Sequence, residues 1–533
     1  MATTKKTPTT MKELKDTLWK AADKLRGSLD ASQYKDIVLG LVFLKYVTDA
    51  FEARRQEIRA ELEAEGEQEE FILEDLEDID AYTEKNVFWV AKNARWEYLQ
   101  THSKGKAAEP GIEAKSIGKL IDEAIQRLMI DNESLNGTLP MIYSRESVDQ
   151  RRLGELVDLF SSTHFTAEGP ERARDLLGEV YEYFLEKFAR AEGKRGGEFY
   201  TPRPVVRTLV EILEPTHGRV YDPCCGSGGM FVQAEKFLEA TSKDPSAIAI
   251  YGQELNERTW RMAKMNLAIH ALSSKGLGVR WSDTFARDIH PNIEMDYVLA
   301  NPPFNIKDWS RTEHDSRWVY GVPPVRNANF AWMQHIISKL ARNGEAGVVM
   351  ANGTMTSTSA GEGEIRQAML EDDVVSCVVA LPPQLFRGTQ IPVCVWFFAD
   401  NKKAGKKGSI DRTGQFLLID ARELGHMIDR TERTFSAEDI QRIANTFRTW
   451  RGRASAEGEY EDVPGFCKSV SLDEIRAADY ALTPGRYVGF AEAKEDAEPI
   501  DEKIARLTAE LTAALDESAR LDTVVREQLG RLK

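Results

Sequence analysis

Val220-Tyr221-Asp222-Pro223-Cys224-Cys225-Gly226-Ser227-Gly228-Gly229 joins a short apolar strand pattern to a helical pattern through a glycine-rich turn. Glycine lets the backbone approach a ligand closely and adopt positive φ, and a turn of this kind is the ligand site of a doubly wound sheet. The spacing is not the G-x-G-x-x-G of dinucleotide folds, and an Asp-Pro precedes it. The turn therefore favours a nucleoside joined to an amino acid over a pyrophosphate, and a tight turn without any ligand is the alternative.

Strand and helix patterns alternate on the C-terminal side of this turn. Such alternation predicts an α/β fold, a Rossmann-like doubly wound sheet with crossover helices. We expect strands at 220–221, 248–253, 297–300, 346–351, 374–381 and 393–399, and helices at 227–239, 256–272, 330–340 and 365–371. The basic loop Lys402–Lys407 is predicted to be a solvated hairpin tip.

Helical patterns dominate the chain before residue 215. After a leader at 1–8, residues 10–13 fit a capping box, and apolar residues recur at helical spacing in 37–51, 117–128, 153–160 and 173–190. The last segment, 500–533, is one long helical pattern with an apolar stripe that its own core or a partner helix must cover. We therefore predict a helical domain at 1–165, a catalytic domain at 166–485 and a C-terminal helical extension at 486–533.

Two acidic residues stand where predicted strands end. Glu254 follows the strand at 248–253, where an acid can bind both hydroxyls of a ribose. Asp283, in Trp281-Ser282-Asp283-Thr284-Phe285, is expected to follow a strand and can accept a hydrogen bond from an adenine amine. Residues 196–204, rich in glycine, proline and aromatic side chains, suggest an ordered loop that closes over the ligand, or else an interdomain hinge.

Asn301-Pro302-Pro303-Phe304 ends the apolar stretch at 295–300. The Asn side-chain oxygen and a prolyl carbonyl can each accept one N–H, and the two prolines lack N–H donors and fix φ. The aromatic ring can stack on a base that has swung out of its duplex. The turn therefore suits the transfer of a methyl group to a planar amino nitrogen. A proline-stiffened loop with a core Phe is the alternative reading.

The bulk composition is that of a soluble globular protein, with 42% hydrophobic and 29% charged residues. No apolar run approaches the ~20 residues of a membrane span, the N-terminus has no signal-peptide pattern, and the five cysteines form no metal-binding spacing. We expect no metal and a reducing, cytoplasmic location.

The net charge of −16 differs from the basic excess of a protein that grips DNA alone. Residues 60–80 carry eleven acidic residues and no basic one, so the rest of the chain carries −5. We expect this acidic run to be a solvated insertion. If the substrate is DNA, a partner supplies much of the binding.

The order of these motifs resembles the modification subunit of type I restriction–modification systems, the γ-class DNA adenine-N6 methyltransferases. The resemblance covers nearly the whole chain. The residues that carry it lie at 33–46, 177–184, 197–202, 301–304, 327–332 and 381–386.

The resemblance implies S-adenosylmethionine as the cofactor. Its contacts would be Glu198, Phe199, Tyr200, Thr201, Pro202, Arg203, Asp222, Gly226, Ser227, Gly228, Gly229, Glu254 (ribose) and Asp283 (adenine amine), with Asn301, Pro302, Pro303 and Phe304 holding a flipped target adenine. The implied partners are DNA, a DNA-specificity subunit that meets the terminal helix, a second modification subunit, and a restriction subunit for cleavage.

Three other readings fit parts of the sequence. A protein-glutamine N5 methyltransferase can use the same Asn-Pro-Pro-aromatic turn, but such enzymes are usually smaller and lack the helical N-terminal domain. A cytosine-N4 methyltransferase more often has Ser in place of Asn301. A cofactor-binding scaffold without activity would not need all the motifs from Glu198 to Phe304 together.

Overall fold

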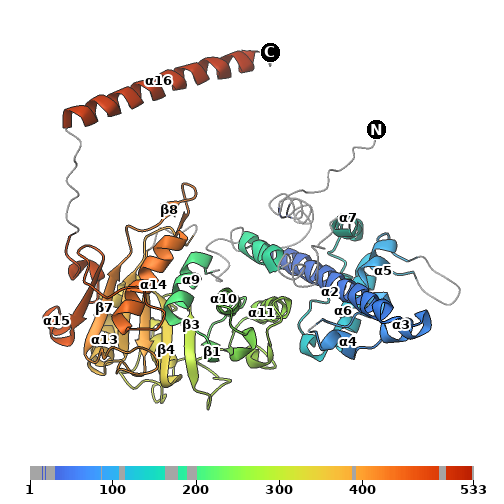
Figure 1. Ribbon diagram of the computed structural model, residues 1–533, viewed down its shortest axis with the longest axis horizontal. Coiled ribbons are helices and arrows are strands. Elements are labelled where there is room, and N and C mark those ends of the chain that lie inside the picture. The colour runs from blue at the N-terminus through green and yellow to red at the C-terminus, as the bar shows by residue number, and fades with distance from the viewer. Residues whose placement is uncertain are drawn as a thin grey trace.

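The computed structural model describes residues 15, 19, 31–85, 87–106, 114–161, 178–188, 201–386, 392–490 and 500–530. Figure 1 shows a helical part from the first third of the chain, a sheet-containing part, and a long last helix that stands away from both. The leader at 1–8, the helix start at 10–13, and the predicted site residues Glu198, Phe199 and Tyr200 lie outside the described residues.

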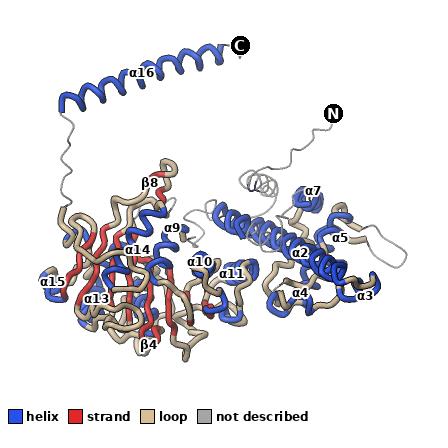
Figure 2. The backbone as a smooth tube through the Cα atoms, viewed as in Figure 1, coloured by secondary structure: helices blue, strands red, loops and turns tan. Residues whose placement is uncertain are grey.

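The helical part is built around α2 (Ala31–Glu65), which is buried almost throughout residues 37–51. A helix buried on most sides needs neighbours all round it. Within the helical part these neighbours include α3 (Glu69–Asp75), α4 (Asp80–Thr83) and α5 (Trp96–Thr101), and α6 (Ile117–Asp131) and α7 (Gln150–Ser161) contribute to the same hydrophobic core. Figure 2 shows strands only in the second part of the molecule, and within the described residues none begins before residue 218. The predicted helical N-terminal region is therefore confirmed.

The acidic run at 60–80 forms the end of α2, then α3 and the start of α4. Most of its carboxylates are exposed, as expected, but Ile72 and Leu76 are buried in the helical core. Basic side chains neutralise part of its charge through the pairs Arg54–Glu61 (3.1 Å), Arg59–Glu69 (3.0 Å) and Arg55–Glu77 (3.2 Å). Ile72 and Leu76 thus make the run part of the helical core. The expectation that the run is solvated holds for most of its carboxylates, and the expectation that it is a mere insertion is wrong for these two buried side chains.

The second part contains an eight-stranded sheet, which confirms the α/β fold class. The strand order is β10-β7-β5-β6-β4-β3-β1-β2. Strands β1, β2, β3 and β4 are mutually parallel where they pair, as are β5 and β7, whereas β6 and β10 run antiparallel to their neighbours. The strands are β1 (Gly218–Asp222), β2 (Ile248–Gly252), β3 (Met295–Ala300), β4 (Leu340–Ala351), β5 (Val375–Ala380), β6 (Val393–Ala399), β7 (Gln415–Asp420) and β10 (Cys467–Ser471).

Helices cover both faces of this sheet. Successive side chains of a strand point to opposite faces, so in β3 Tyr297 and Leu299 join one core and Val298 and Ala300 join the other. The first face is covered by α9 (Arg203–Leu213), α10 (Gly229–Ala240), α11 (Glu257–Ile269) and α14 (Ala437–Arg451), and the second by α12 (Asn329–Ser338), α13 (Glu362–Glu371) and α15 (Leu472–Ala477). Burial on both faces explains why the strands read as continuous apolar runs.

Helix α11 joins the two parts. Its residues Met262, Met265 and Ile269 belong to the hydrophobic core of the helical part, while its Trp260 packs in the core of the sheet. Two tyrosines of the helical part donate hydrogen bonds to its backbone: Tyr46 Oη to Ile269 O (3.2 Å) and Tyr181 Oη to Met262 O (3.4 Å). The helical part therefore packs directly on the sheet domain.

Three local expectations differ from the structure. Residues 278–283 form no strand, so Asp283 lies in an irregular segment after η5 (Lys275–Leu277). Lys402, predicted to be solvated, is buried and donates to Val375 O (2.9 Å) and Gln415 O (2.7 Å). Strands β7 and β10, helix α14 and the hairpin of β8 (His426–Met427) and β9 (Arg433–Thr434) lie outside the elements predicted from the sequence.

The chain ends in α16 (Ile500–Gly530), a single helix of 31 residues. Its described side chains are exposed, including Leu507, Leu511, Leu515 and Leu521. Among the described residues, no helix is both long and apolar enough to cross a membrane.

Candidate active site

The predicted site residues gather at the carboxyl ends of three neighbouring parallel strands. Strand β1 lies between β3 and β2. Asp222 is the last residue of β1, Glu254 follows β2 by two residues, and Asn301 follows β3 directly. Ligands of open α/β sheets bind in the crevice outside these strand ends. Three residues that are far apart in the sequence thus line one edge of the sheet.

The glycine-rich turn after β1 is fixed by backbone hydrogen bonds to the segment that follows β2. Gln253 N donates to Asp222 O (3.0 Å), and Cys225 N donates to Gln253 O (2.9 Å). Gly226 and Gly228 have φ values of 54° and 79°, where a side chain would be strained. Gly228 is the N-cap of α10, so the turn opens directly onto a helix N-terminus.

Two carboxylates of the turn region have different environments. Asp222 is buried and its Oδ1 accepts from Cys224 N (2.9 Å), yet burial raises the pKa of Asp222 to about 7. Glu254 is half-buried, and its two oxygens accept from Gly226 N (3.1 Å) and Asn256 N (2.8 Å). The carboxylate of Glu254 is thereby held against the glycine turn, at the position expected for an acid that binds ribose hydroxyls.

Asp283 begins a tight turn that the neighbouring strand end supports. Its Oδ1 accepts from Phe285 N (2.8 Å), and its Oδ2 accepts from Ser310 Oγ (2.7 Å). Gln253, fully buried after β2, donates from Nε2 to Arg287 O (2.7 Å) and accepts at Oε1 from Ile289 N (3.2 Å). The irregular segment that carries Asp283 is thus held by side-chain hydrogen bonds where a strand was expected.

Arg317 is a site residue that sequence reasoning missed. Its guanidinium donates to Thr284 O (2.9 Å) and Phe285 O (3.0 Å), and it pairs with Asp315 (2.6 Å). It also donates to His335 Nδ1 (3.1 Å), and burial followed by the charge of Arg317 lowers the pKa of His335 to about 3. No local pattern marks this role, because the two carbonyls that Arg317 holds belong to Thr284 and Phe285, which are 33 and 32 residues away in the sequence.

The amide of Asn301 has two contrasting ends. Nδ2 donates to Thr201 Oγ1 (2.9 Å). Oδ1 is buried and has no hydrogen-bond partner among the described residues. A buried acceptor without a partner is costly, and here it belongs to the residue predicted to accept a hydrogen bond from an amino group.

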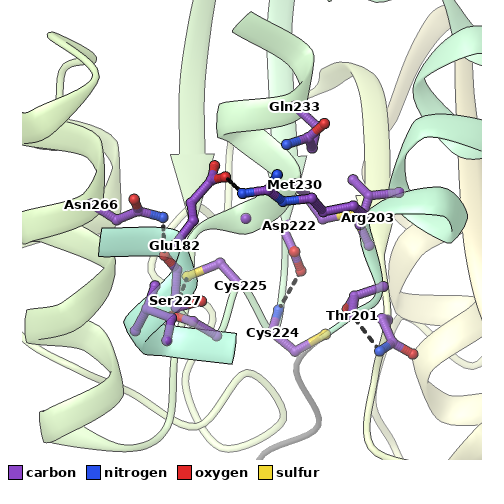
Figure 3. A pocket seen from close by; sticks show the side chains of 15 residues that line it. Glu182, Thr201, Arg203, Asp222, Cys224, Cys225, Ser227, Met230, Gln233 and Asn266 are labelled. Carbon is purple, nitrogen blue, oxygen red and sulfur yellow. Dashed lines mark hydrogen bonds and ion pairs between the residues drawn. The ribbon is translucent and has the colours of Figure 1, made fainter. Parts of the chain in front are cut away.

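Two cavities meet at this strand edge, and Cys224, Gly226 and Asn301 line both. The larger holds about 430 Å³ and the smaller, shown in Figure 3, about 60 Å³. Of the predicted site residues, the larger is lined by Gly226, Glu254, Asp283, Asn301, Pro302, Pro303 and Phe304. The smaller is lined by Thr201, Arg203, Asp222, Gly226, Ser227, Gly229 and Asn301. Pro202 and Gly228 line neither cavity.

An aromatic wall completes the larger cavity. Phe285, Trp309 and Trp332 line it. The ring centroid of Phe285 lies 4.9 Å from that of Trp309 and 4.3 Å from that of Trp332. Aromatic side chains and carboxylates together suit a planar, amine-bearing ligand. Among the described residues no cluster of three His, Cys, Asp or Glu side chains could hold a metal ion.

Two family models match the chain. The N-6 DNA Methylase model matches residues 172–496, and the HsdM N-terminal domain model matches residues 14–160. The chain is similar to the type I restriction enzyme HindI methylase subunit of Haemophilus influenzae, with 45% identity over 83% of this chain and 99% of that one. It is also similar to the MjaIX methylase subunit of Methanocaldococcus jannaschii, with 38% identity over 98% and 91% of the two chains.

The fold has a counterpart among solved structures. The type I restriction–modification methyltransferase subunit from Streptococcus thermophilus superposes with a TM-score of 0.71 over 90% of this chain and 100% of that one, at 24% identity. The fold of this chain therefore occurs in that solved structure as well.

Proposed function

Because the chain belongs to the N-6 DNA Methylase family, as the modification subunit of a type I restriction–modification system that methylates adenine in DNA, we propose that the cleft at the ends of β1, β2 and β3 is its active site. The buried Oδ1 of Asn301, which has no hydrogen-bond donor among the described residues, carries the proposal. It is an acceptor at the place where an exocyclic amine must be held.

S-adenosylmethionine supplies an electrophilic methyl group on a sulfonium sulfur. The described residues fit such a cofactor, because carboxylates, glycines and aromatic rings line adjoining cavities. Glu254 would hold the ribose hydroxyls and Asp283 the adenine amine. Residues of the smaller cavity, with Arg203 as the cation for a carboxylate, would hold the amino-acid moiety. Pro202 and Gly228 would contribute by fixing the backbone conformation of the segments that line the cavities. The predicted contacts of Glu198, Phe199 and Tyr200 stay predictions.

The target adenine is proposed to leave its duplex and stack on Phe304, which is half-buried at the cavity wall. Asn301 Oδ1 and the Pro302 carbonyl accept the two N6 hydrogens, so the nitrogen becomes more pyramidal and its lone pair points toward the methyl carbon. Pro303 keeps this turn rigid. Positioning and preorganised acceptors would supply most of the acceleration.

The chain is proposed to act in a complex. Its net charge of −16 provides no general attraction for DNA, so sequence reading and much of the DNA binding fall to a specificity subunit. A second modification subunit and a restriction subunit would complete the assembly. The proposed division is a helical domain at 1–165, a catalytic domain at 166–485, whose segment 178–188 packs in the core of the helical part, and an extension at 486–533, in which α16 docks on the specificity subunit.

The deciding experiment measures methyl transfer from labelled S-adenosylmethionine to DNA, with and without the co-expressed specificity subunit, and identifies the product nucleoside. We expect N6-methyladenine only when the specificity subunit is present. Transfer by the chain alone would show that it binds and reads DNA itself. Cofactor binding without transfer in either sample would contradict the proposed active site.

A further inference from the structure

The orientation of the Asn301 amide is the feature that the proposed mechanism leaves unexplained. The mechanism needs Oδ1, and not Nδ2, to face the target amine, because an amide nitrogen and an amine would oppose donor to donor. In the structure Nδ2 donates to Thr201 Oγ1 (2.9 Å), and Oδ1 has no partner among the described residues. Figure 3 shows this hydrogen bond beside the labelled Thr201. Thr201 therefore occupies the one end of the amide that the reaction does not use.

We propose that Thr201 is the positioning residue of Asn301: its hydroxyl oxygen holds Nδ2 and thereby turns Oδ1 toward the target adenine. The proposal rests on the proposed function of Asn301 and adds to it the group that fixes the orientation of the Asn301 side-chain amide. It requires no contact between Thr201 and the target base.

A hydroxyl both donates and accepts, so the Thr201 contact alone would hold the amide in either orientation. The orientation is fixed once the hydroxyl hydrogen is donated to a second acceptor, because the oxygen can then only accept. Thr201 lines the smaller cavity together with Arg203 and Ser227, where the proposed function places the amino-acid part of the cofactor. The cofactor carboxylate is the second acceptor that we assign. Binding of the methyl donor would thus also set the residue that receives the adenine.

The backbone that carries Thr201 is anchored by the helical part of the molecule. Arg203, two residues further on, pairs with Glu182. The Glu182 side chain is only 6% exposed and also pairs with Lys236 of α10 (3.1 Å). Its neighbour Tyr181 is fully buried in the core of the helical part. Because only Pro202 separates Thr201 from Arg203, a carboxylate of the helical part limits where the Thr201 hydroxyl can lie.

The test uses the full chain in complex with its specificity subunit and compares duplexes that carry adenine or purine at the target position. Purine lacks the 6-amino group. The ratio of the affinity for the adenine duplex to the affinity for the purine duplex therefore reports whether Asn301 accepts a hydrogen bond from that group. With saturating S-adenosylhomocysteine, Thr201→Val should lower this ratio about tenfold, the loss expected for one hydrogen bond. Thr201→Ser keeps the hydroxyl and should restore the ratio.

Thr208→Val is the matched control. Thr208 lies on α9, is fully buried, and its hydroxyl donates only to the backbone oxygen of Pro204 (2.8 Å). This variant loses a buried hydroxyl from α9, the helix that follows Thr201, and should keep the adenine-to-purine ratio. Loss of the ratio in both variants would mean that α9 has been disturbed, and would overturn a specific role of Thr201. An unchanged ratio in Thr201→Val would overturn the proposal as well.

The role of the carboxylate is tested by replacing S-adenosylhomocysteine with 5′-methylthioadenosine, which lacks the amino-acid moiety. The wild-type ratio should then fall to that of Thr201→Val, and the variant should not change further. A wild-type ratio that is the same with both ligands would overturn the assignment of the cofactor carboxylate. If wild type does not distinguish adenine from purine with either ligand, the proposed function of Asn301 is itself wrong, and this outcome differs from every outcome above.

The anchor is tested in the same assay with Glu182→Gln, which keeps the shape of the side chain and removes its charge. We expect the ratio to fall about threefold, less than for Thr201→Val, because the hydroxyl remains. Glu179→Gln is the control, since Glu179 lies on the same helical segment, is about half exposed and pairs with Lys15 (2.9 Å), away from Arg203. Equal effects of the two substitutions would overturn the role of Glu182.

Discussion

Asn301, Asp222, Glu254 and Asp283 all lie at strand ends or in turns beside them, but their local environments differ. Among the described residues Asn301 Oδ1 is buried without a hydrogen-bond partner, Glu254 and Asp283 accept from backbone N–H groups, and Asp222 is buried with a raised pKa. A side chain held by the fold loses little freedom on binding a ligand. Preorganisation of these few groups is therefore the main contribution of the site.

Asn301→Ala should reduce methyl transfer by about 10²–10³-fold, the usual loss for one preorganised group that acts on the reacting centre. Cofactor affinity should stay within a few-fold, because the proposed contacts of Asn301 are with the target base. Single-turnover transfer and S-adenosylhomocysteine titration measure the two effects. A large loss of cofactor affinity would contradict the role assigned to Asn301.

Asp222 predicts a pH dependence of stability. Burial raises its pKa from 3.8 to about 7, so at pH values between these two the folded state holds a proton that the unfolded state has released. The stabilisation that this proton gives the folded state is complete below about pH 4 and is lost as the pH rises through 7. Between about pH 5.5 and 8, the unfolding temperature of Asp222→Asn should therefore fall less than that of the wild type. The difference should be ~2–4 °C for each kcal/mol that ionisation of buried Asp222 costs.

Asp244→Asn is the control for that experiment. Asp244 is exposed, and hydrogen bonds from Ser246 lower its pKa, so it stays ionised over the same pH range. Its replacement should leave the pH dependence as in wild type. An Asp222→Asn protein with the wild-type fall in unfolding temperature would show that Asp222 is already ionised at the lower pH.

At the scale of elements, the two irregular segments beside the sheet depend on each other. Arg317, in the segment between β3 and α12, holds the carbonyls of Thr284 and Phe285. Because the guanidinium can only donate, His335 Nδ1 must accept from it, and the neutral ring then donates from Nε2 to Tyr221 Oη (3.1 Å). A chain of hydrogen bonds thus connects β1, α12 and the turn of Asp283.

Arg317→Met should weaken S-adenosylhomocysteine binding about tenfold or more, because the turn that carries Asp283 loses two hydrogen bonds and leaves buried carbonyls without donors. Titration calorimetry measures the affinity. Arg326→Met, an exposed arginine of the same segment, should bind as wild type does. Wild-type affinity in Arg317→Met would show that Asp283 is held by its own turn alone.

At the scale of the whole molecule, α11 joins the helical part to the sheet and α16 stands apart from both. The described leucines of α16 are exposed, with Leu511 and Leu515 each 61% exposed. An apolar stripe of this kind is stabilised only when another surface covers it. Under the proposed function, the specificity subunit would provide that surface.

Leu511→Ala combined with Leu515→Ala should weaken the complex with the specificity subunit, while leaving S-adenosylhomocysteine affinity unchanged. Light scattering of the co-expressed proteins measures complex formation. Thr508→Ala combined with Thr512→Ala is the matched control, because these residues are also exposed on α16 and contribute little apolar surface. Equal complex formation by both double variants would contradict docking through the leucines.

The sequence by itself determined the order of the strands from β1 to β6 and the residues at the ends of β1, β2 and β3. Apolar periodicity fixes strands and helices locally, and the glycine turn and the Asn-Pro-Pro-Phe turn are short motifs whose chemistry is contained in neighbouring residues. The parallel strand ends then had to bring Asp222, Glu254 and Asn301 together, as they do.

Only the tertiary structure decided how these residues are held. Lys402 is buried because β5 and β7 supply carbonyls for it, although its local sequence reads as a solvated loop. The segment before Asp283 forms no strand, and the turn after it is held from elsewhere in the chain, because Gln253 binds the carbonyl of Arg287 and Arg317 binds that of Thr284. Thr201 likewise meets Asn301 across a hundred residues. Such contacts join residues whose sequence separation carries no periodic signal, so their partners become visible only when the chain is folded.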